Sequence, residues 1–317
     1  MRSGSVGAIA ALCCMFLASA PAVAQQVPLP PLNLGSTSFV DGVAGPGILL
    51  QQTLVPYHAG RFDGAQGQQL PGDNSVTALG SLSQVVFISR VKFLGAYVGA
   101  EILLPAAHVN VETDLGVRGS DGGVGDLILG PVMLQWPEHK VFGKPLWQRV
   151  VLDIDVPTGS YDRNQPVNVG SNLVSLNPHY AATLFLTPKL ETSWRFHYLW
   201  NSRNNDPNPV YRASNIQPGQ AFHFNAAVSY QVMPRLRIGV NAYYLKEITD
   251  PRIGGLAIPH AREQVGSIGP GMLLSLKPVD LILNAFFEMG AENRPQGVRV
   301  VVRILKFFPR PEVKAKP

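Results

Sequence analysis

Two pairs of side chains in this sequence have the types and spacing that chemistry requires. His197 and His223 point to the same side of two successive predicted strands, and two imidazoles can bind a metal ion or act as a catalytic pair. Asp153 and Asp155 lie two residues apart, so both fall on one strand face, as an acid–base carboxylate pair would. The histidines have no third ligand at a defined spacing. We therefore expect no metal site and no cofactor.

An enzymatic role is not the expected one for these residues. Two carboxylates on one strand face are also found where that face meets water or a calcium ion bound near a loop. A hydrolase built on a β-barrel would place a serine two residues after a histidine, and none of the seven histidines has one. We predict that the chain is not an enzyme, with a barrel hydrolase as the minor alternative.

The segment that carries His197 alternates as a two-faced strand does. One face of residues 190–201 holds four aromatic rings, and the other holds charges of both signs. The first face consists of Leu190, Thr192, Trp194, Phe196, Tyr198 and Trp200, and the second of Glu191, Ser193, Arg195, His197 and Asn201. Only Leu199 breaks the rule. Such a strand suits a membrane barrel, with lipid outside and water inside.

Alternation and turn residues predict about twelve strands along the chain. They lie near residues 47–57, 75–90, 96–107, 125–136, 147–157, 177–187, 190–201, 219–232, 235–247, 265–276, 280–289 and 297–308. The parity breaks at Gln51–Gln52 and Ser83–Gln84, where a bulge or a misplaced strand end would explain it.

The links between these strands alternate in length. Links after even-numbered strands are mostly short, and links after odd-numbered strands are mostly long and polar, with residues 137–146 somewhat long for a turn. Outer-membrane barrels have tight periplasmic turns and long outer loops, and an even strand count leaves both termini in the periplasm. The predicted fold class is all-β, a transmembrane antiparallel up-and-down barrel whose last strand pairs with its first.

The ends of the chain and its composition agree with export to an outer membrane. Residues 1–24 have the charge, apolar run and Ala22–Val23–Ala24 site of a cleaved signal peptide, and both cysteines lie within it. After it, no run of 18 apolar residues predicts a membrane helix. Charged residues are 15% of the chain and mean hydropathy is +0.10, less polar than a soluble domain with about 25% charged residues.

Two further segments flank the predicted barrel of residues 47–308. Residues 25–46 begin with an apolar, proline-rich run and continue with small residues, which suits no strand of the wall. They either fold into the lumen as a plug or remain a periplasmic leader. Residues 309–317 form a charged periplasmic tail, a departure from barrels that end on an aromatic residue.

Four short sequence segments, taken in their order along the chain, resemble those of a known family. They are Gly35–Gly42 followed by Gly45–Pro46–Gly47, then Leu103–Leu104–Pro105, then Gly123–Asp126 leading to Gly130–Pro131, and finally Asp155–Tyr161. Together they resemble the phenol degradation meta-pathway family of outer-membrane proteins. The resemblance covers nearly all of the mature chain and implies a transporter or channel encoded beside pathways for aromatic compounds. It implies no active site for phenol.

The alternation also predicts which polar side chains face the lumen. The candidates are Glu101, Asp153, Asp155, Arg195, His197, His223, Asn225, Arg237, Glu288, Arg299 and Arg303. They either form a constriction that orients an anionic or phenolic solute, or neutralise one another in a narrow lumen. Five cations near predicted periplasmic ends are interpreted as interface residues whose charge reaches the headgroups, namely Arg90, Arg149, Lys189, Arg235 and Lys306.

The expected function is an outer-membrane channel that admits small hydrophobic or aromatic solutes. The expected partners are outer-membrane lipid and that solute, because the isoelectric point near 9.2 comes without a clustered basic face for nucleic acid. The alternative is a structural or adhesive barrel, although its predicted loops are rich in Gly, Asn and Pro and poor in aromatic residues.

Overall fold

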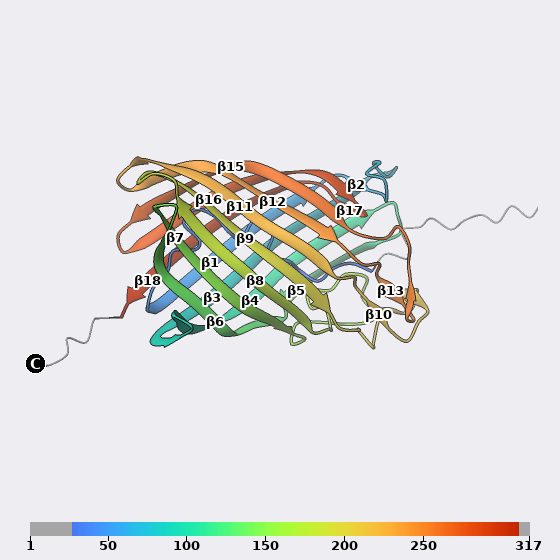
Figure 1. The fold of residues 1–317 in the computed structure, drawn as a ribbon. Helices are drawn as coiled ribbons and strands as arrows, with labels where there is room; N and C mark the ends of the chain where they lie inside the picture. The colour runs from blue at the N-terminus through green and yellow to red at the C-terminus, as the bar shows by residue number, and fades with distance from the viewer. Residues whose placement is uncertain (1–26, 311–317) are drawn as a thin grey trace, which may run out of the picture.

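The computed structural model describes residues 27–310, which form a closed antiparallel β-barrel (Figure 1). Twelve long strands make the wall. They are β1 (Gly47–Ala59), β3 (Asn74–Phe93), β4 (Ala96–Thr113), β6 (Leu127–Val141), β7 (Lys144–Val156), β8 (Ser175–Phe185), β9 (Leu190–Asn201), β11 (Ala221–Met233), β12 (Leu236–Glu247), β15 (Gln264–Leu276), β16 (Val279–Glu292) and β18 (Val298–Pro309). The prediction of an all-β barrel of twelve strands is confirmed. The predicted signal peptide, 1–24, and residues 311–317 of the predicted tail lie outside the described residues.

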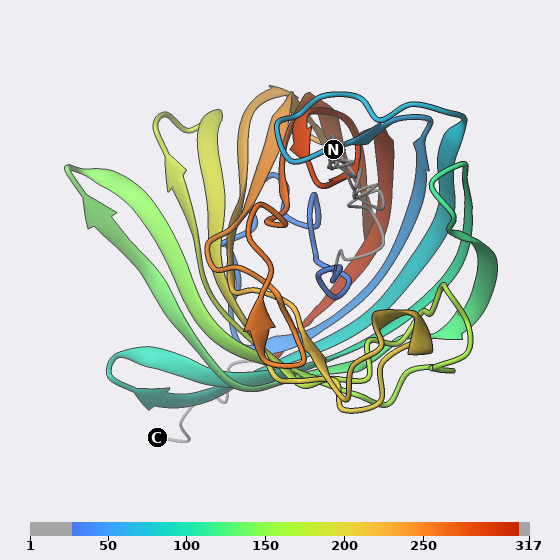
Figure 2. The same ribbon diagram turned by 90° about the vertical axis from the view of Figure 1, so that its right-hand side faces the viewer.

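The barrel closes through the pairing of its first and last strands. Gly47 of β1 lies opposite Pro309 of β18, and the ladder continues to His58 opposite Val298. Every other wall strand pairs with its neighbours along the chain, so the wall has no free edge (Figure 2). Within residues 27–310 no helix is long and apolar enough to span a membrane.

The alternation of side chains sets the two surfaces of the wall. On β9, Phe196 and Tyr198 are each 41% exposed, whereas Glu191 and His197 on the other face are buried. The same outward apolar set recurs around the barrel and includes Leu54, Ile102, Val228, Val240, Ile268, Leu283 and Ile304. An apolar outer belt around a polar interior is the surface that an outer membrane requires, which places the protein there.

Short turns gather at one end of the barrel and longer loops at the other (Figure 1). At the loop end, β4 continues to Thr113 and pairs there with β5 (Arg118–Val124), so much of the link predicted at 107–123 is strand. The minor strands at this end are β2 (Phe62–Asp63), β17 (Arg294–Pro295), β10 (Ile216–Gln217), β13 (Arg252–Ile253) and β14 (Leu256–Ala257), with a short 3-10 helix at Pro209–Tyr211.

Residues 137–146 differ from the predicted link. β6 continues to Val141 and β7 begins at Lys144, joined by Phe142 and Gly143. Both central residues have positive φ, 49° and 74°, which is the geometry of a turn whose twist matches that of paired strands. The prediction missed this hairpin because Phe142 is not a residue that usually occupies such a turn.

The parity breaks in the first two strands are not bulges. β1 and β3 pair without a register shift, with Gln51 opposite Gln84 and Gln52 opposite Ser83. Gln51 Nε2 donates to Gln84 Oε1 at 2.8 Å, and Ser83 Oγ donates to Gln52 Oε1 at 2.6 Å. Two adjacent glutamines therefore point to opposite faces, and each is satisfied by the strand beside it.

A charge placed on the outer belt tests this arrangement. We expect Val228→Arg to destabilise the barrel by about 2–4 kcal/mol, because Val228 lies near the middle of β11 and faces outward. The matched control is Met233→Arg at the turn end of the same strand, where the expected loss is about 0–1 kcal/mol. Denaturant unfolding in lipid vesicles measures both, and equal losses would contradict a membrane-embedded belt.

Candidate functional site: the barrel lumen and its inner segment

The lumen contains part of the chain itself. Residues 27–46, here called the inner segment, run inside the wall before β1 begins, as the blue trace within the ring shows (Figure 2). Leu29 lies beside Glu263 at the loop end, and Gly47 pairs with Pro309 at the turn end. The inner segment therefore traverses the barrel lengthwise. Residues 25 and 26 of the predicted flanking segment lie outside the described residues.

Apolar side chains of the wall hold the loop-side half of the inner segment. Leu34 packs in a buried cluster with Leu199, Tyr243, Phe286 and Val301. This explains why Leu199 breaks the alternation of β9: it faces the lumen but is buried there in the cluster that contains Leu34, away from water. The apolar lumen residues of β16 and β18 have the same cause.

A second apolar contact holds the turn-side half of the inner segment, and next to Leu34 the backbone approaches a ring closely. Phe39 is buried against Ala227, Leu273 and Ile282. Gly35 has a φ of +76°, and a Cβ there would lie 2.9 Å from the ring of Phe286. Glycine is required at this position both by its backbone conformation and by the ring beside it.

Lumen side chains also bind the backbone of the inner segment. Gly35 N donates to Asn225 Oδ1 at 2.7 Å, and Arg303 donates to the carbonyl of Ser36. Arg299 donates to Leu34 O at 3.4 Å. These side chains replace the partners that a strand or a helix would supply, so an irregular segment is accommodated inside the barrel.

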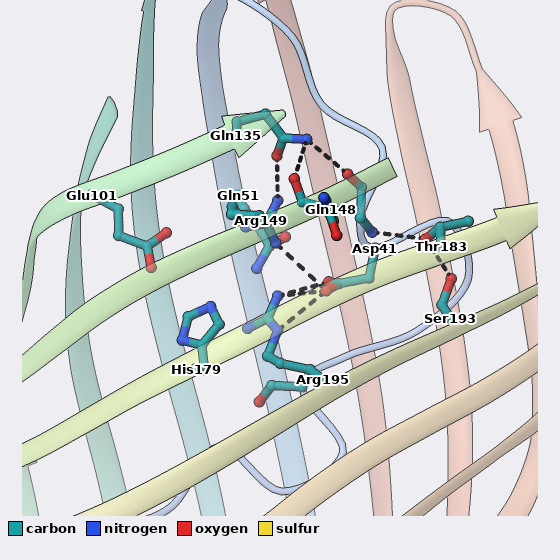
Figure 3. Close-up of polar contacts among 12 residues, drawn as sticks. Asp41, Gln51, Glu101, Gln135, Gln148, Arg149, His179, Thr183, Ser193 and Arg195 are labelled. Atoms are coloured by element: carbon teal, nitrogen blue, oxygen red, sulfur yellow. Dashed lines mark hydrogen bonds and ion pairs between the residues drawn. The ribbon is translucent and has the colours of Figure 1, made fainter. Parts of the chain in front are cut away.

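One carboxylate of the inner segment is paired with two arginines of the wall (Figure 3). Asp41 accepts from Arg195 Nη2 at 2.8 Å, and Arg149 Nη2 lies 3.5 Å away. All three side chains are largely buried. The interpretation of Arg149 as an interface residue is wrong, because the parity of β7 turns it inward with Val151 and Asp153.

A chain of hydrogen bonds continues from Asp41 along the wall. Its members are Gly42, Thr183, Ser193, Glu191, Ser229 and Arg237. Gly42 N donates to Thr183 Oγ1 at 2.8 Å, and at the far end Arg237 Nε donates to Ser229 Oγ at 2.9 Å. Arg237 is thus placed at the turn end, supporting the wall beneath the inner segment.

The ion pair of Asp41 predicts how the inner segment responds to acid. Burial raises the pKa of Asp41, but the charges of Arg195 and Arg149 oppose this and hold it below its usual 3.8. Ionised Asp41 therefore stabilises docking of the inner segment, and this contribution is fully present above pH 3.8. It is lost as the pH falls through the lower pKa of the docked carboxyl. We expect channel conductance to be constant down to pH 3.8 and to rise below it.

Planar-bilayer recordings against pH check this expectation. Asp41→Asn should remove the acid-induced step, because the amide does not titrate. A step well above pH 3.8 that persists in the variant would assign the pH response to another group.

At the loop end, Glu288 and Arg299 surround two tyrosines. Glu288 accepts from Tyr57 at 2.8 Å and from Tyr243 at 2.7 Å. The Arg299 guanidinium lies 5.1 Å from the Tyr57 ring centroid and 5.8 Å from that of Tyr243. This polar group supports the side of the lumen where Leu34 docks.

A row of imidazoles crosses three adjacent strands. His197 stacks on His223 with ring centroids 4.2 Å apart, and His179 lies on its other side at 4.8 Å. The three are directly opposite one another in the strand register. His179 was not predicted, although the alternation of residues 177–187 would have turned it inward.

His179 also meets two carboxylates. Its Nδ1 lies 3.2 Å from Asp153 Oδ2, and Glu101 completes a group whose potential ligand atoms lie within 4.8 Å of one another. Asp155, the other member of the predicted pair, is buried farther toward the loop end and lines a different cavity. Asp153 and Asp155 thus line different cavities, and Asp153 lies beside His179.

All eleven predicted lumen residues are turned inward. Nine are buried, and Arg195 and Arg299 keep a small exposed fraction. Among residues 27–310, no ion pair joins two of the eleven; the partners are Asp41 for Arg195 and His179 for Asp153. Four of them, Arg195, Asn225, Arg299 and Arg303, bind the inner segment.

Two cavities remain between the inner segment and the opposite wall. The turn-side cavity has a volume of about 470 Å³, and the loop-side cavity about 380 Å³. Both are lined by Asn33 and Ser36 of the inner segment and by Leu82 of β3, so they meet at these three residues. The sizes are those of small-molecule sites, about 300–1,000 Å³.

Comparison with known proteins agrees with this architecture. The chain resembles the crystal structure of an outer membrane channel from Pseudomonas putida F1, with a TM-score of 0.71 and 20% identity over 84% of this chain and 97% of that one. It also resembles the transport unit of the autotransporter AIDA-I from Escherichia coli, with a TM-score of 0.52 and 9% identity over 83% and 91%. None of the curated proteins matches it.

A family model decides the relationship. The model described as a putative MetA-pathway of phenol degradation matches residues 59–304, which is most of the barrel. The resemblance found in the sequence is confirmed. The chain belongs to this family of outer-membrane barrel proteins.

Proposed function

We propose that this barrel is a channel for small hydrophobic or aromatic solutes, with the inner segment as its constriction. The observation that carries the proposal is the pair of cavities that follow one another along the lumen and meet at Leu82. Together their linings reach from loop residues such as Asn168 to Gly47 and Phe307 at the turn end. A solute that passes the contact between them crosses the barrel.

The chemistry of the lining supports an apolar solute. The wall of the turn-side cavity contributes Leu49, Leu82, Val86, Ile88, Leu103 and Met133. Seven charged side chains also line this cavity, and three of them, Asp41, Arg149 and Arg195, are paired with one another. Water in such a lining has few partners, so transfer of an aromatic ring into it is favourable. A sugar would lose hydrogen bonds with water that these apolar side chains do not replace.

Uptake by cells with an intact outer membrane tests the proposal. Cells that produce the protein should take up labelled toluene faster than cells that lack it, and labelled glucose at an unchanged rate. Leu82→Trp, which fills the contact between the cavities, should remove most of the gain. Leu104→Trp is the matched control, because Leu104 lies on the adjacent strand but is 47% exposed on the outer face.

Two outcomes would contradict the proposal. Equal stimulation of toluene and glucose uptake would show a general pore. Unchanged toluene uptake on production of a correctly inserted barrel would leave the structural or adhesive alternative.

A further inference from the structure

We propose that Glu101, Asp153 and His179 form a binding site for a first-row divalent metal ion of the zinc class in the wall of the turn-side cavity. One ligand atom from each lies within 4.8 Å of the others. Ligands at about 2.0–2.2 Å from a common zinc ion can be no more than about 4 Å apart, so rotamer shifts of under about 1 Å would close the site.

The three residues come from three different strands of a rigid wall. Glu101 lies on β4, Asp153 on β7 and His179 on β8, and all three are buried. Gly130 on β6 lies between the first two, and a Cβ there would be 2.6 Å from Glu101 Cγ and 2.9 Å from Asp153 Oδ1. Glycine at this position lets the two carboxylates approach each other across the intervening strand.

Two ligand atoms lack the partners that buried polar atoms normally have. Asp153 Oδ1 has no hydrogen bond, and neither does His179 Nδ1, whose 3.2 Å approach to Asp153 is not aligned as one. Within the described residues, the hydrogen bond of Glu101 is from Gln84 Nε2 at 2.8 Å, to Oε2. Buried atoms left in this way are satisfied when a cation occupies the space between them.

The nearby arginines do not prevent this. Arg195 is bonded to Asp41, which also lies 3.5 Å from Arg149, so one carboxylate offsets part of the positive charge. Within residues 27–310 neither arginine forms an ion pair with Glu101 or Asp153. A divalent ion would thus meet two carboxylates that are paired with neither arginine.

The ligand set identifies the class of metal. One imidazole with two carboxylates suits zinc and its first-row neighbours, whereas calcium takes six to eight oxygen ligands. Three protein ligands leave a coordination position open. Glu101 and Asp153 line the turn-side cavity, so that position would face the space through which solute passes.

The test is a zinc titration of tag-free protein, stripped with chelator and folded in detergent, followed by isothermal calorimetry. We expect one zinc ion per chain, and at least tenfold weaker binding in H179Q and in E101Q. H223Q is the matched control, because His223 is buried in the same row but lies outside the ligand set. It should bind zinc as the wild type does.

Folding and location are checked separately. Heat-modifiable mobility on gels shows that each variant forms the barrel. Anomalous diffraction from zinc-soaked wild-type crystals should give a peak among the three side chains without relying on any variant. No zinc binding by the wild type, undiminished binding in folded H179Q, or a peak elsewhere would overturn the proposal. Channel activity enters none of these readouts.

Discussion

Deleting residues 27–44 is expected to raise single-channel conductance several-fold. The inner segment occupies the lumen along its length, and its removal joins the two cavities with the space that it fills. Wall closure depends on the ladder between β1 and β18, which begins at Gly47 and is untouched by the deletion. The barrel should therefore persist as a wider, water-filled pore. Planar-bilayer recording of the folded protein measures the change.

The matched control keeps the length of the segment but removes its contacts. Replacing residues 27–44 with a glycine–serine sequence of equal length leaves a tether in the lumen without Leu34, Phe39 or Asp41 to anchor it. We expect a noisy conductance between those of the wild type and the deletion. A deletion variant with wild-type conductance would show that ions follow a path that the inner segment does not narrow.

Asp41→Asn is expected to weaken docking of the inner segment by roughly 3–5 kcal/mol, because it leaves Arg149 and Arg195 buried without their carboxylate. Hydrogen exchange of residues 27–46 should accelerate, while exchange of β9 and β11 changes little. Mass spectrometry of peptides from each region measures both rates in one experiment.

The matched control removes a carboxylate from an exposed pair of similar geometry. Asp250 lies 2.7 Å from Arg262 in the loops, and loss of such a surface pair costs under about 1 kcal/mol. Replacing the buried group as a whole, with D41L, R149M and R195L together, should recover much of the loss, since no charge is then left unpaired. Slow exchange of the inner segment in D41N would show that its apolar contacts alone hold it.

The wall could be predicted because alternation is a local property. The face on which a residue such as Val228 lies is set by the alternation of its neighbours. The number of strands, the closure of the barrel and the residues that face the lumen can therefore be predicted from the sequence. The alternation also contained the answer for Arg149 and His179, which lie on inward positions of strands already recognised. Arg149 was assigned to the interface because it lies near the end of its predicted strand. His179 was left out because His197 and His223 on successive strands already formed a pair.

The inner segment could not be predicted in the same way. Residues 27–46 have no period, so nothing local relates Asp41 to Arg195, which lies on the seventh wall strand. Its hydrogen-bond partners come from β8, β9, β11 and β18, brought together only when the barrel closes. The apolar residues at the lumen-facing positions 199 and 286 did indicate such a segment, because Leu199 and Phe286 would not face a lumen filled only with water.

In the described part of the chain, three adjacent strands of the wall give the inner segment no hydrogen bond. Among the described residues its hydrogen bonds go to wall strands beyond β4, whereas β1, β3 and β4 give none yet line both cavities. Residues such as Ala78 and Ala106, which line the loop-side cavity, can therefore be exchanged without removing a hydrogen bond of the inner segment. In the proposed channel, such a division would let the solute preference be redesigned on these three strands while the hydrogen bonds that hold the inner segment stay in place.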